Sequence, residues 1–298
     1  MHLQRHRRVR PKRLPASNVN FMSALCTVIA SATLASVDAR PATAQSTAAA
    51  PPAPIHEAVE ADRPGEGYAT SVVAGGEHQI ESGASFTRAG SAHDLAVGEM
   101  LLRFGVGHRI ELRTALNSYE MRSADGVRTH GLEDGFVGAK VRLTAEPSAE
   151  PSAEATEPRS AARPEVAVVV GTSIPNGRRP FGHHASEPEA ALVGHWAVLD
   201  DVGFDVTLGA AARSISPSGY RAERTATFTA DRHVTSSLSG FLEYHLARAV
   251  DEDELARTAS AGLVVAVRPT VQIDAWVAAS VHAAAPHQTG GIGVARRW

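Results

Sequence analysis

The hydrophobic pattern is clearest near the end of the chain, where apolar side chains occupy every second position. The intervening positions are mostly polar or small. A strict two-residue period is typical of a β-strand whose two faces meet different environments. Residues 261–267 show the same pattern before the break Arg268-Pro269-Thr270, and a short loop leads on to residues 290–298. The alternating apolar positions are Val271, Ile273, Ala275, Val277, Ala279 and Val281.

The same period recurs upstream and predicts an all-β protein with about twelve antiparallel strands. Among the earlier segments, residues 203–213 alternate most regularly and residues 95–105 least regularly. The nine predicted strands that precede the last three are Glu77–Thr87, Leu95–Gly105, Ile110–Tyr119, Gly135–Leu143, Glu165–Ile174, Ala190–Leu199, Gly203–Arg213, Arg221–Ala230 and Ser236–Leu246.

The connections between these segments alternate in length. Short turns are predicted near residues 106, 201, 232 and 269, and longer polar loops near 125, 180, 217, 252 and 285. Residues 120–133 in particular are polar and are expected to form a surface loop. This alternation is typical of an up-and-down outer-membrane barrel, with short turns in the periplasm and long loops outside. An even strand count places both termini on the short-turn side.

The two faces of the predicted strands differ in charge. In a membrane the apolar face would contact lipid, and the opposite face would line a water-filled lumen, where charges bias which solutes pass. A soluble sandwich of two sheets would show the same alternation. The charges could also simply pair across neighbouring strands. The lumen-lining selectivity candidates are Glu81, Glu111, Arg113, Lys140, Arg142, Asp205, Arg213, Glu243 and Asp274.

Residues 1–44 are expected to be a cleaved export signal. A basic start precedes the apolar segment Phe21–Val37, and Ala42-Thr43-Ala44 supplies a small-x-small cleavage site. An uncleaved membrane anchor fits less well, because the apolar segment contains several serine and threonine residues. We therefore expect residues 45–75 to be a flexible N-terminal segment and residues 76–298 to form a barrel in the outer membrane of a Gram-negative-type bacterium.

Residues 146–164 are expected to be a disordered insertion within the barrel. They are rich in proline, serine and alanine, and the motif Glu-Pro-Ser-Ala occurs twice. The strand pattern is the same on both sides, which favours one domain with an inserted loop over two domains joined by a linker. The insertion replaces a short turn, so we expect it on the periplasmic side.

Charge and cysteine content exclude several classes of function. The whole chain has a formal net charge of −3, and its first 44 residues carry seven basic residues and one acid, which leaves about −9 after cleavage. Such a surface argues against a nucleic-acid partner. The single cysteine, Cys26, allows no disulfide framework and no cysteine-based zinc site.

No catalytic or cofactor site is predicted. His183, His184 and His195 could bind a metal, but their spacing completes no known ligand pattern, and an exposed polar loop explains the first two. The serine and histidine residues lie in no recognised nucleophile motif, so we expect no enzyme activity, no metal and no cofactor. Trp196 and Trp276 are expected to be interfacial belt or packing residues, as is Trp298.

Several motifs resemble one family of exported proteins. They are Ala61-Asp62-Arg63-Pro64-Gly65, residues 79–87, residues 103–113, residues 135–143 and residues 165–175. Together they resemble the family labelled "putative MetA-pathway of phenol degradation" from about Asp62 to Trp298. The resemblance implies an outer-membrane β-barrel that transports small, often aromatic, molecules. It supplies no defined functional residues, and the insertion at 146–164 departs from the family pattern.

The sequence therefore predicts an outer-membrane channel for the passive movement of small, possibly aromatic or hydrophobic, solutes. The expected partners are these solutes, outer-membrane lipid and the barrel-assembly machinery, which the terminal Trp298 implies. The alternative is an exported soluble or surface β-protein that binds a ligand or partner without transport.

Overall fold

The structure, a computed structural model, describes residues 59–144, 163–183, 185–216, 219–250, 254–281 and 287–298. The predicted export signal and nearly all of the predicted insertion lie outside these residues. The described residues contain fourteen strands: β1 (His78–Ala89), β2 (Ala92–Val106), β3 (Ile110–Leu116), β4 (Tyr119–Ala124), β5 (Val127–Leu132), β6 (Gly135–Arg142), β7 (Glu165–Ile174), β8 (Pro188–Leu199), β9 (Val202–Ser216), β10 (Gly219–His233), β11 (Leu238–Ala249), β12 (Ala256–Arg268), β13 (Val271–Ser280) and β14 (His287–Arg297).

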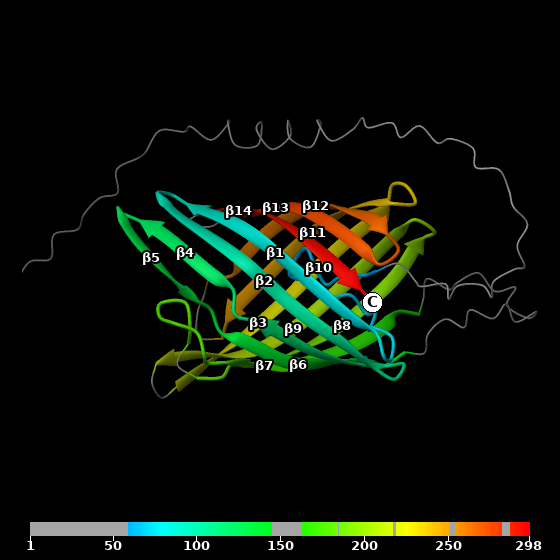
Figure 1. The fold of residues 1–298 in the computed structure, drawn as a ribbon, viewed down its shortest axis with the longest axis horizontal. Helices are drawn as coiled ribbons and strands as arrows, with labels where there is room; N and C mark the ends of the chain where they lie inside the picture. Colours follow the sequence, from blue (N-terminus) through cyan, green and yellow to red (C-terminus); the bar gives the residue numbers. More distant parts are fainter. Residues whose placement is uncertain (1–58, 145–162, 184, 217–218, 251–253, 282–286) are drawn as a thin grey trace, which may run out of the picture. The chain divides into compact units, whose positions relative to one another are not determined.

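Twelve of these strands close into an antiparallel barrel, as the alternating pattern predicts. Each strand pairs with its neighbour, and β1 pairs with both β2 and β14, which closes the ring. The other two strands, β4 and β5, form a hairpin whose first strand pairs with the start of β2. Figure 1 shows the strands crossing the barrel wall obliquely. Closure gives every wall strand two partners and leaves no edge.

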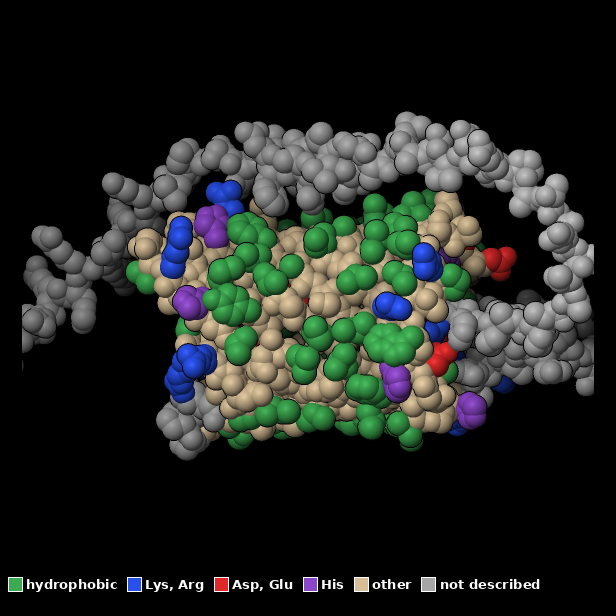
Figure 2. Space-filling view, in the orientation of Figure 1, with side chains coloured by type: hydrophobic (Ala, Val, Ile, Leu, Met, Phe, Trp, Pro, Cys, Tyr) green, Lys and Arg blue, Asp and Glu red, His purple; other side chains and the backbone are tan. Residues whose placement is uncertain are grey.

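The barrel is apolar outside and polar inside. The largest fully buried side chains include Arg103, Lys140 and Glu111, whereas Leu242 is 66% exposed and Ile292 is 65% exposed. In Figure 2 hydrophobic side chains cover the middle of the outer wall, and basic and histidine side chains gather toward its two ends. This arrangement reverses that of a soluble domain and suits a wall with lipid outside. No helix in the described residues is both long and apolar enough to cross a membrane.

A bulge in β2 explains the irregular pattern of residues 95–105. Gly83 pairs with Glu99 and Ala84 pairs with Val97, so Gly98 of β2 has no partner residue on β1. Gly98 has φ +76°, which glycine adopts at little cost. The extra residue shifts the parity of the strand, so that Asp94 and Arg103 both point inward although one has an even number and the other an odd number.

The end of the barrel that carries the predicted long loops differs from expectation in two places. Residues 120–133, predicted as a surface loop, form most of the β4–β5 hairpin, which turns at Asp125-Gly126. The loop predicted near residue 217 is short, because β9 extends to Ser216 and β10 begins at Gly219. Strands that extend beyond a membrane have water on both faces, so their sequences need no apolar face and can resemble loops.

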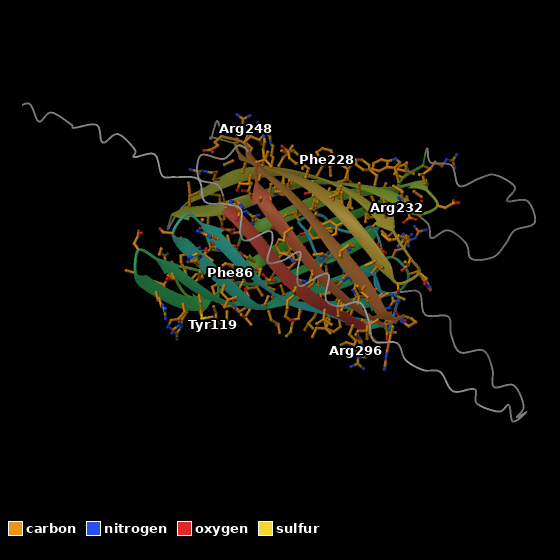
Figure 3. All side chains as sticks on the ribbon, turned by 90° about the horizontal axis from the view of Figure 1, so that it is seen from above. Phe86, Tyr119, Phe228, Arg232, Arg248 and Arg296 are labelled. Carbon is orange, nitrogen blue, oxygen red and sulfur yellow. The ribbon has the colours of Figure 1, made fainter. Side chains whose placement is uncertain are left out.

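The opposite end has several tight connections and both ends of the described chain. Two or three residues link β2 to β3, β8 to β9 and β12 to β13 there. Aromatic side chains lie on the outer wall near each end. His78 packs against Phe104 and Trp298 at the tight-turn end, and Phe86 stacks on His93 at the other. In Figure 3 Phe86 and Tyr119 lie toward one end and Arg296 toward the other. Such belts are typical of barrels at membrane interfaces.

Candidate functional site

The interior of the barrel holds the chain segment that precedes β1. Residues 59–77, here called the lumen loop, begin and end at the tight-turn end, where the Val59 N–H donates to the Pro269 carbonyl and the Gly105 N–H donates to the Glu77 carbonyl. Between these points Val73 is 1% exposed and Thr70 is 5% exposed. The part of the expected flexible segment that the structure describes, residues 59–75, is thus held inside the barrel by specific contacts.

Asp62 anchors the first half of the lumen loop. Its carboxylate accepts hydrogen bonds from Lys140 Nζ at 2.8 and 3.0 Å and from Arg113 Nη2 at 2.5 Å. Burial opposes ionisation of Asp62, but the nearby cations Lys140, Arg103 and Arg113 outweigh burial and hold its pKa well below the usual range. Asp62 is therefore a buried carboxylate that stays charged because three cations surround it.

Arg103 lies at the centre of the same cluster. Its guanidinium donates to Glu81 at 2.8 Å and to Glu111 at 2.8 and 2.7 Å, and also to the Glu60 carbonyl of the lumen loop at 3.0 Å. Arg103 is 1% exposed. The cluster balances its charge, with three carboxylates against three cations: Asp62, Glu81, Glu111, Arg103, Arg113 and Lys140. Buried ions persist in pairs of this kind because each partner replaces the water that the other loses.

Glu243, on the opposite wall, holds the tip of the lumen loop. Its carboxylate accepts the Glu66 N–H at 3.0 Å and the Gly67 N–H at 3.1 Å, and Ser260 also donates to it. Gly65 has φ +126°, and a Cβ there would lie 2.7 Å from a Glu243 carboxylate oxygen. The turn therefore needs glycine at position 65 for both its backbone conformation and the space that it leaves.

Removing the Glu243 charge should free the tip of the loop selectively. In Glu243→Gln we expect the amide protons of Glu66 and Gly67 to exchange with solvent roughly tenfold faster, since a hydrogen bond to a charged group contributes about 1.5–3 kcal/mol. Hydrogen–deuterium exchange with mass spectrometry measures this. The Val73 N–H, which donates to Glu111 at 2.9 Å, is the internal control and should not change. Equal acceleration at all three amides would instead indicate general loosening.

The lumen loop covers only one side of the interior. On the side of β8 to β11 the wall borders a cavity of about 280 Å³, with Tyr68 of the loop on its opposite side. A second cavity of about 380 Å³ shares Arg213, Glu223 and Ala247 with the first and is lined further toward the long-loop end by Ile215 and Glu254. The two cavities are therefore adjoining, and together they run from the long-loop end to the loop tip.

The cavity walls combine small apolar side chains with charges. Ala167, Val169, Ala191 and Val193 form a buried apolar cluster on β7 and β8, and Tyr68 packs against it. Arg213 is central to the charged part, because its guanidinium lies 2.9 Å from Glu223, 3.3 Å from Glu189 and 3.4 Å from Glu187. Its side chain is 40% exposed, in contrast to the 1% of Arg103.

All nine sequence-derived selectivity candidates face the barrel interior, but they fall into distinct groups. Glu81, Glu111, Arg113 and Lys140 belong to the buried cluster under the lumen loop, and Glu243 binds the loop tip. Three others pair locally. Arg142 lies 2.9 Å from Glu165, Asp205 lies 2.9 Å from His195, and Asp274 lies 4.0 Å from Arg63 of the lumen loop. Among the nine, only Arg213 lines the cavities.

The sequence analysis did not identify the main ion-pair partners of these nine charged residues. Asp62 belongs to a motif used only for the family resemblance, and Arg103 lies beyond the bulge that disrupts the alternation. Glu187, Glu189 and Glu223, which surround Arg213, were also missed. Glu187 and Glu189 precede the inward residues Ala191 and Val193 of β8 at intervals of two residues, and this spacing was the signal that could have placed them inside the barrel.

Of the histidines considered for metal binding, His183 and His195 do not come together, and His184 lies outside the described residues. His183 lies 3.3 Å from Asp134 in the loop before β8, while His195 pairs with Asp205 on the barrel wall. Within the described ranges no group of three or more histidine, cysteine or acidic side chains is placed to hold a metal ion.

Comparison with known proteins identifies a family and a fold. The model of the family described as "Putative MetA-pathway of phenol degradation" matches residues 61–298. This range begins within the lumen loop, so the loop belongs to the matched region. The comparison with curated proteins finds no match.

Solved structures with a similar fold are outer-membrane barrels. The COG4313 outer membrane channel from Pseudomonas putida F1 is 11% identical, with a TM-score of 0.54 over 76% of this chain and 97% of that chain. The NanC porin is 10% identical, with a TM-score of 0.49 over 73% and 98%. The CymD monoaromatic hydrocarbon channel is 12% identical, with a TM-score of 0.38 over 76% and 88%. At these identities the likeness describes the fold.

Proposed function

The chain belongs to the family described as "Putative MetA-pathway of phenol degradation", and from that premise we propose that it is an outer-membrane channel for passive movement of small solutes. The observation that carries the proposal is the interior. A closed barrel with an apolar outer wall contains adjoining cavities that run from the long-loop end to the tip of the lumen loop. The matched channel and porin structures share this barrel fold.

The lumen loop limits the size of the solute. It fills the side of the lumen that holds the buried cluster, and the two cavities lie along β8 to β11, so the route is narrow and off-centre. Alanine and valine side chains on this wall provide apolar contact area, while Thr207 and Thr225 provide hydrogen-bonding groups. Small molecules that combine an apolar body with a polar group suit such a lining. CymD is described as a monoaromatic hydrocarbon channel, and an aromatic solute of that size fits this proposal.

The outer wall supports a membrane location over the alternative of a soluble exported β-protein. Leu192, Leu208 and Leu242 project outward from the middle of their strands, and each is between 47% and 66% exposed. A soluble protein rarely leaves so continuous an apolar surface in water. In the outer membrane this surface contacts lipid, and the barrel-assembly machinery inserts the chain.

Filling the cavity should reduce transport. Ala211 of β9 lines the first cavity, so the ring in Ala211→Phe is expected to lower single-channel conductance in planar bilayers by at least about twofold. Ala212→Phe is the matched control, because the next residue on the strand points outward to lipid and should leave conductance unchanged. Equal conductance in both variants, or equal loss in both, would contradict a route along this wall.

A further inference from the structure

The charges inside the barrel are divided between two sides. The side beneath the lumen loop carries Arg103, Arg113 and Lys140, and these cations are neutralised by the carboxylates of the buried cluster. The solute route on the other side has its own set of charges. A solute in this route meets that second set and not the buried cluster.

Carboxylates outnumber cations along the first cavity. Glu66 of the lumen loop, Glu189 of β8 and Glu223 of β10 line it, and Arg213 is the only arginine or lysine among its lining residues. Arg213 is already shared among Glu187, Glu189 and Glu223 at 2.9 to 3.4 Å. One guanidinium cannot neutralise three carboxylates, and Glu66 adds a fourth from the opposite side of the cavity. His245 is the one remaining titratable side chain besides Tyr68 that lines this cavity.

Glu66 is placed to act on a passing solute. The loop tip is fixed by Glu243, which accepts the backbone N–H of Glu66, and the Glu66 side chain lines the first cavity. Glu66 is exposed within the cavity although the barrel wall surrounds it. Glu66 and the Arg213 group line the same cavity.

We infer that Glu66, Glu189 and Glu223 make this route selective for cationic solutes over anionic ones. This inference rests on the proposed channel function and adds the charge class of the solute. An excess of negative charge in a narrow, poorly solvated passage attracts cations and repels anions, because the low-dielectric wall strengthens the field inside. An aromatic solute that carries an ammonium group would satisfy both the apolar wall and these carboxylates.

The test compares two permanently charged aromatic ions of similar size. Benzyltrimethylammonium and benzenesulfonate do not cross lipid unaided, so their entry into liposomes that contain the full mature protein reports the channel. Burial within the barrel, partly offset by His245 and reinforced by Glu243 and Glu99, raises the pKa of Glu66. The measurement is therefore made at about pH 8, because a higher pH favours the ionised form of a carboxyl whose pKa is raised.

In the wild type we expect benzyltrimethylammonium to enter at least about threefold faster than benzenesulfonate. The variant Glu66→Gln/Glu189→Gln/Glu223→Gln should lose this preference or reverse it, since Arg213 and Arg221 then line the two cavities against Glu254. Asp201→Asn, which removes an acid from an exposed turn outside the route, should keep the preference. Heat-modifiable migration on a gel verifies that each variant is folded.

Four results would overturn the inference. Equal or faster entry of benzenesulfonate in the wild type would show that the carboxylates do not govern the route. An unchanged preference in the triple variant would assign the selectivity to other groups. If neither organic ion enters while potassium chloride still conducts, the proposed channel function is supported and the proposed selectivity for organic cations is wrong. If nothing passes at all, the proposed channel fails with it.

Discussion

Deleting residues 59–75 is expected to raise single-channel conductance by roughly fivefold or more, because the lumen loop is the main obstruction in the barrel. The deletion also removes Asp62 from the buried cluster. The wall then presents Arg103, Arg113 and Lys140 against only Glu81 and Glu111, so the widened pore should also shift toward anion selectivity. Both effects are measured in planar bilayers, from step size and from the reversal potential in a salt gradient.

Deleting residues 146–162 provides a control of equal length. These seventeen residues belong to the proline-, serine- and alanine-rich insertion, and their loss should leave conductance and selectivity unchanged. Each variant must first show the heat-modifiable migration of a folded barrel. A folded loop-deletion variant with wild-type conductance would contradict the assignment of the lumen loop as the constriction.

Replacing Arg103 with alanine is expected to produce the largest loss of stability among single substitutions. Glu81 and Glu111 would keep their negative charges in a buried environment without their principal cation. Breaking a buried pair by removing one partner typically costs about 3–5 kcal/mol, because the remaining charge is desolvated and uncompensated. Urea-induced unfolding in lipid vesicles, followed by tryptophan fluorescence, gives the change in the free energy of unfolding.

Arg232→Ala is the matched control for this substitution. Arg232 forms a 2.8 Å ion pair with Asp201 in an exposed turn, where its side chain is 69% exposed. Ion pairs of this kind contribute about 0–1 kcal/mol, so its loss should be small. If Arg103→Ala costs no more than Arg232→Ala, the interior cluster is well hydrated and contributes little to the stability of the barrel.

The barrel could be predicted from the sequence because the membrane imposes a strict pattern on each strand. Residues 203–213 illustrate this. Phe204, Val206 and Leu208 point to lipid, and Asp205 and Thr207 point inward. The alternation of apolar and polar residues therefore identifies the two faces of the strand. Apart from the bulge in β2, the pattern fails where its physical cause is absent. In the β4–β5 hairpin no lipid-facing side chain is required, and residues 120–133 therefore resemble a loop.

The lumen loop could not be predicted from local pattern. Its contacts join residues far apart in the chain, as when the Gly67 N–H donates to Glu243, and no periodicity records such a pairing. Asp62, Pro64 and Gly65 are also common in ordinary turns. The nine interior charges could be assigned to the lumen from strand parity. Strand parity does not show which charges the lumen loop covers. Arg113 lies under the loop and is neutralised there, whereas Arg213 lines the cavities and can meet a solute.

The position of the lumen loop inside a membrane-embedded barrel can be tested directly by a disulfide. A Cβ on Gly67 would lie 3.2 Å from Thr229 Oγ1 of β10, so cysteines at these positions are close enough to join. Gly67→Cys/Thr229→Cys is expressed as the full chain, outer membranes are isolated and oxidised, and the link between positions 67 and 229 is sought by mass spectrometry. The account predicts that the link forms in the outer-membrane fraction. Finding the protein in the soluble periplasmic fraction, or both thiols in the membrane fraction unlinked and open to a bulky maleimide, would contradict it.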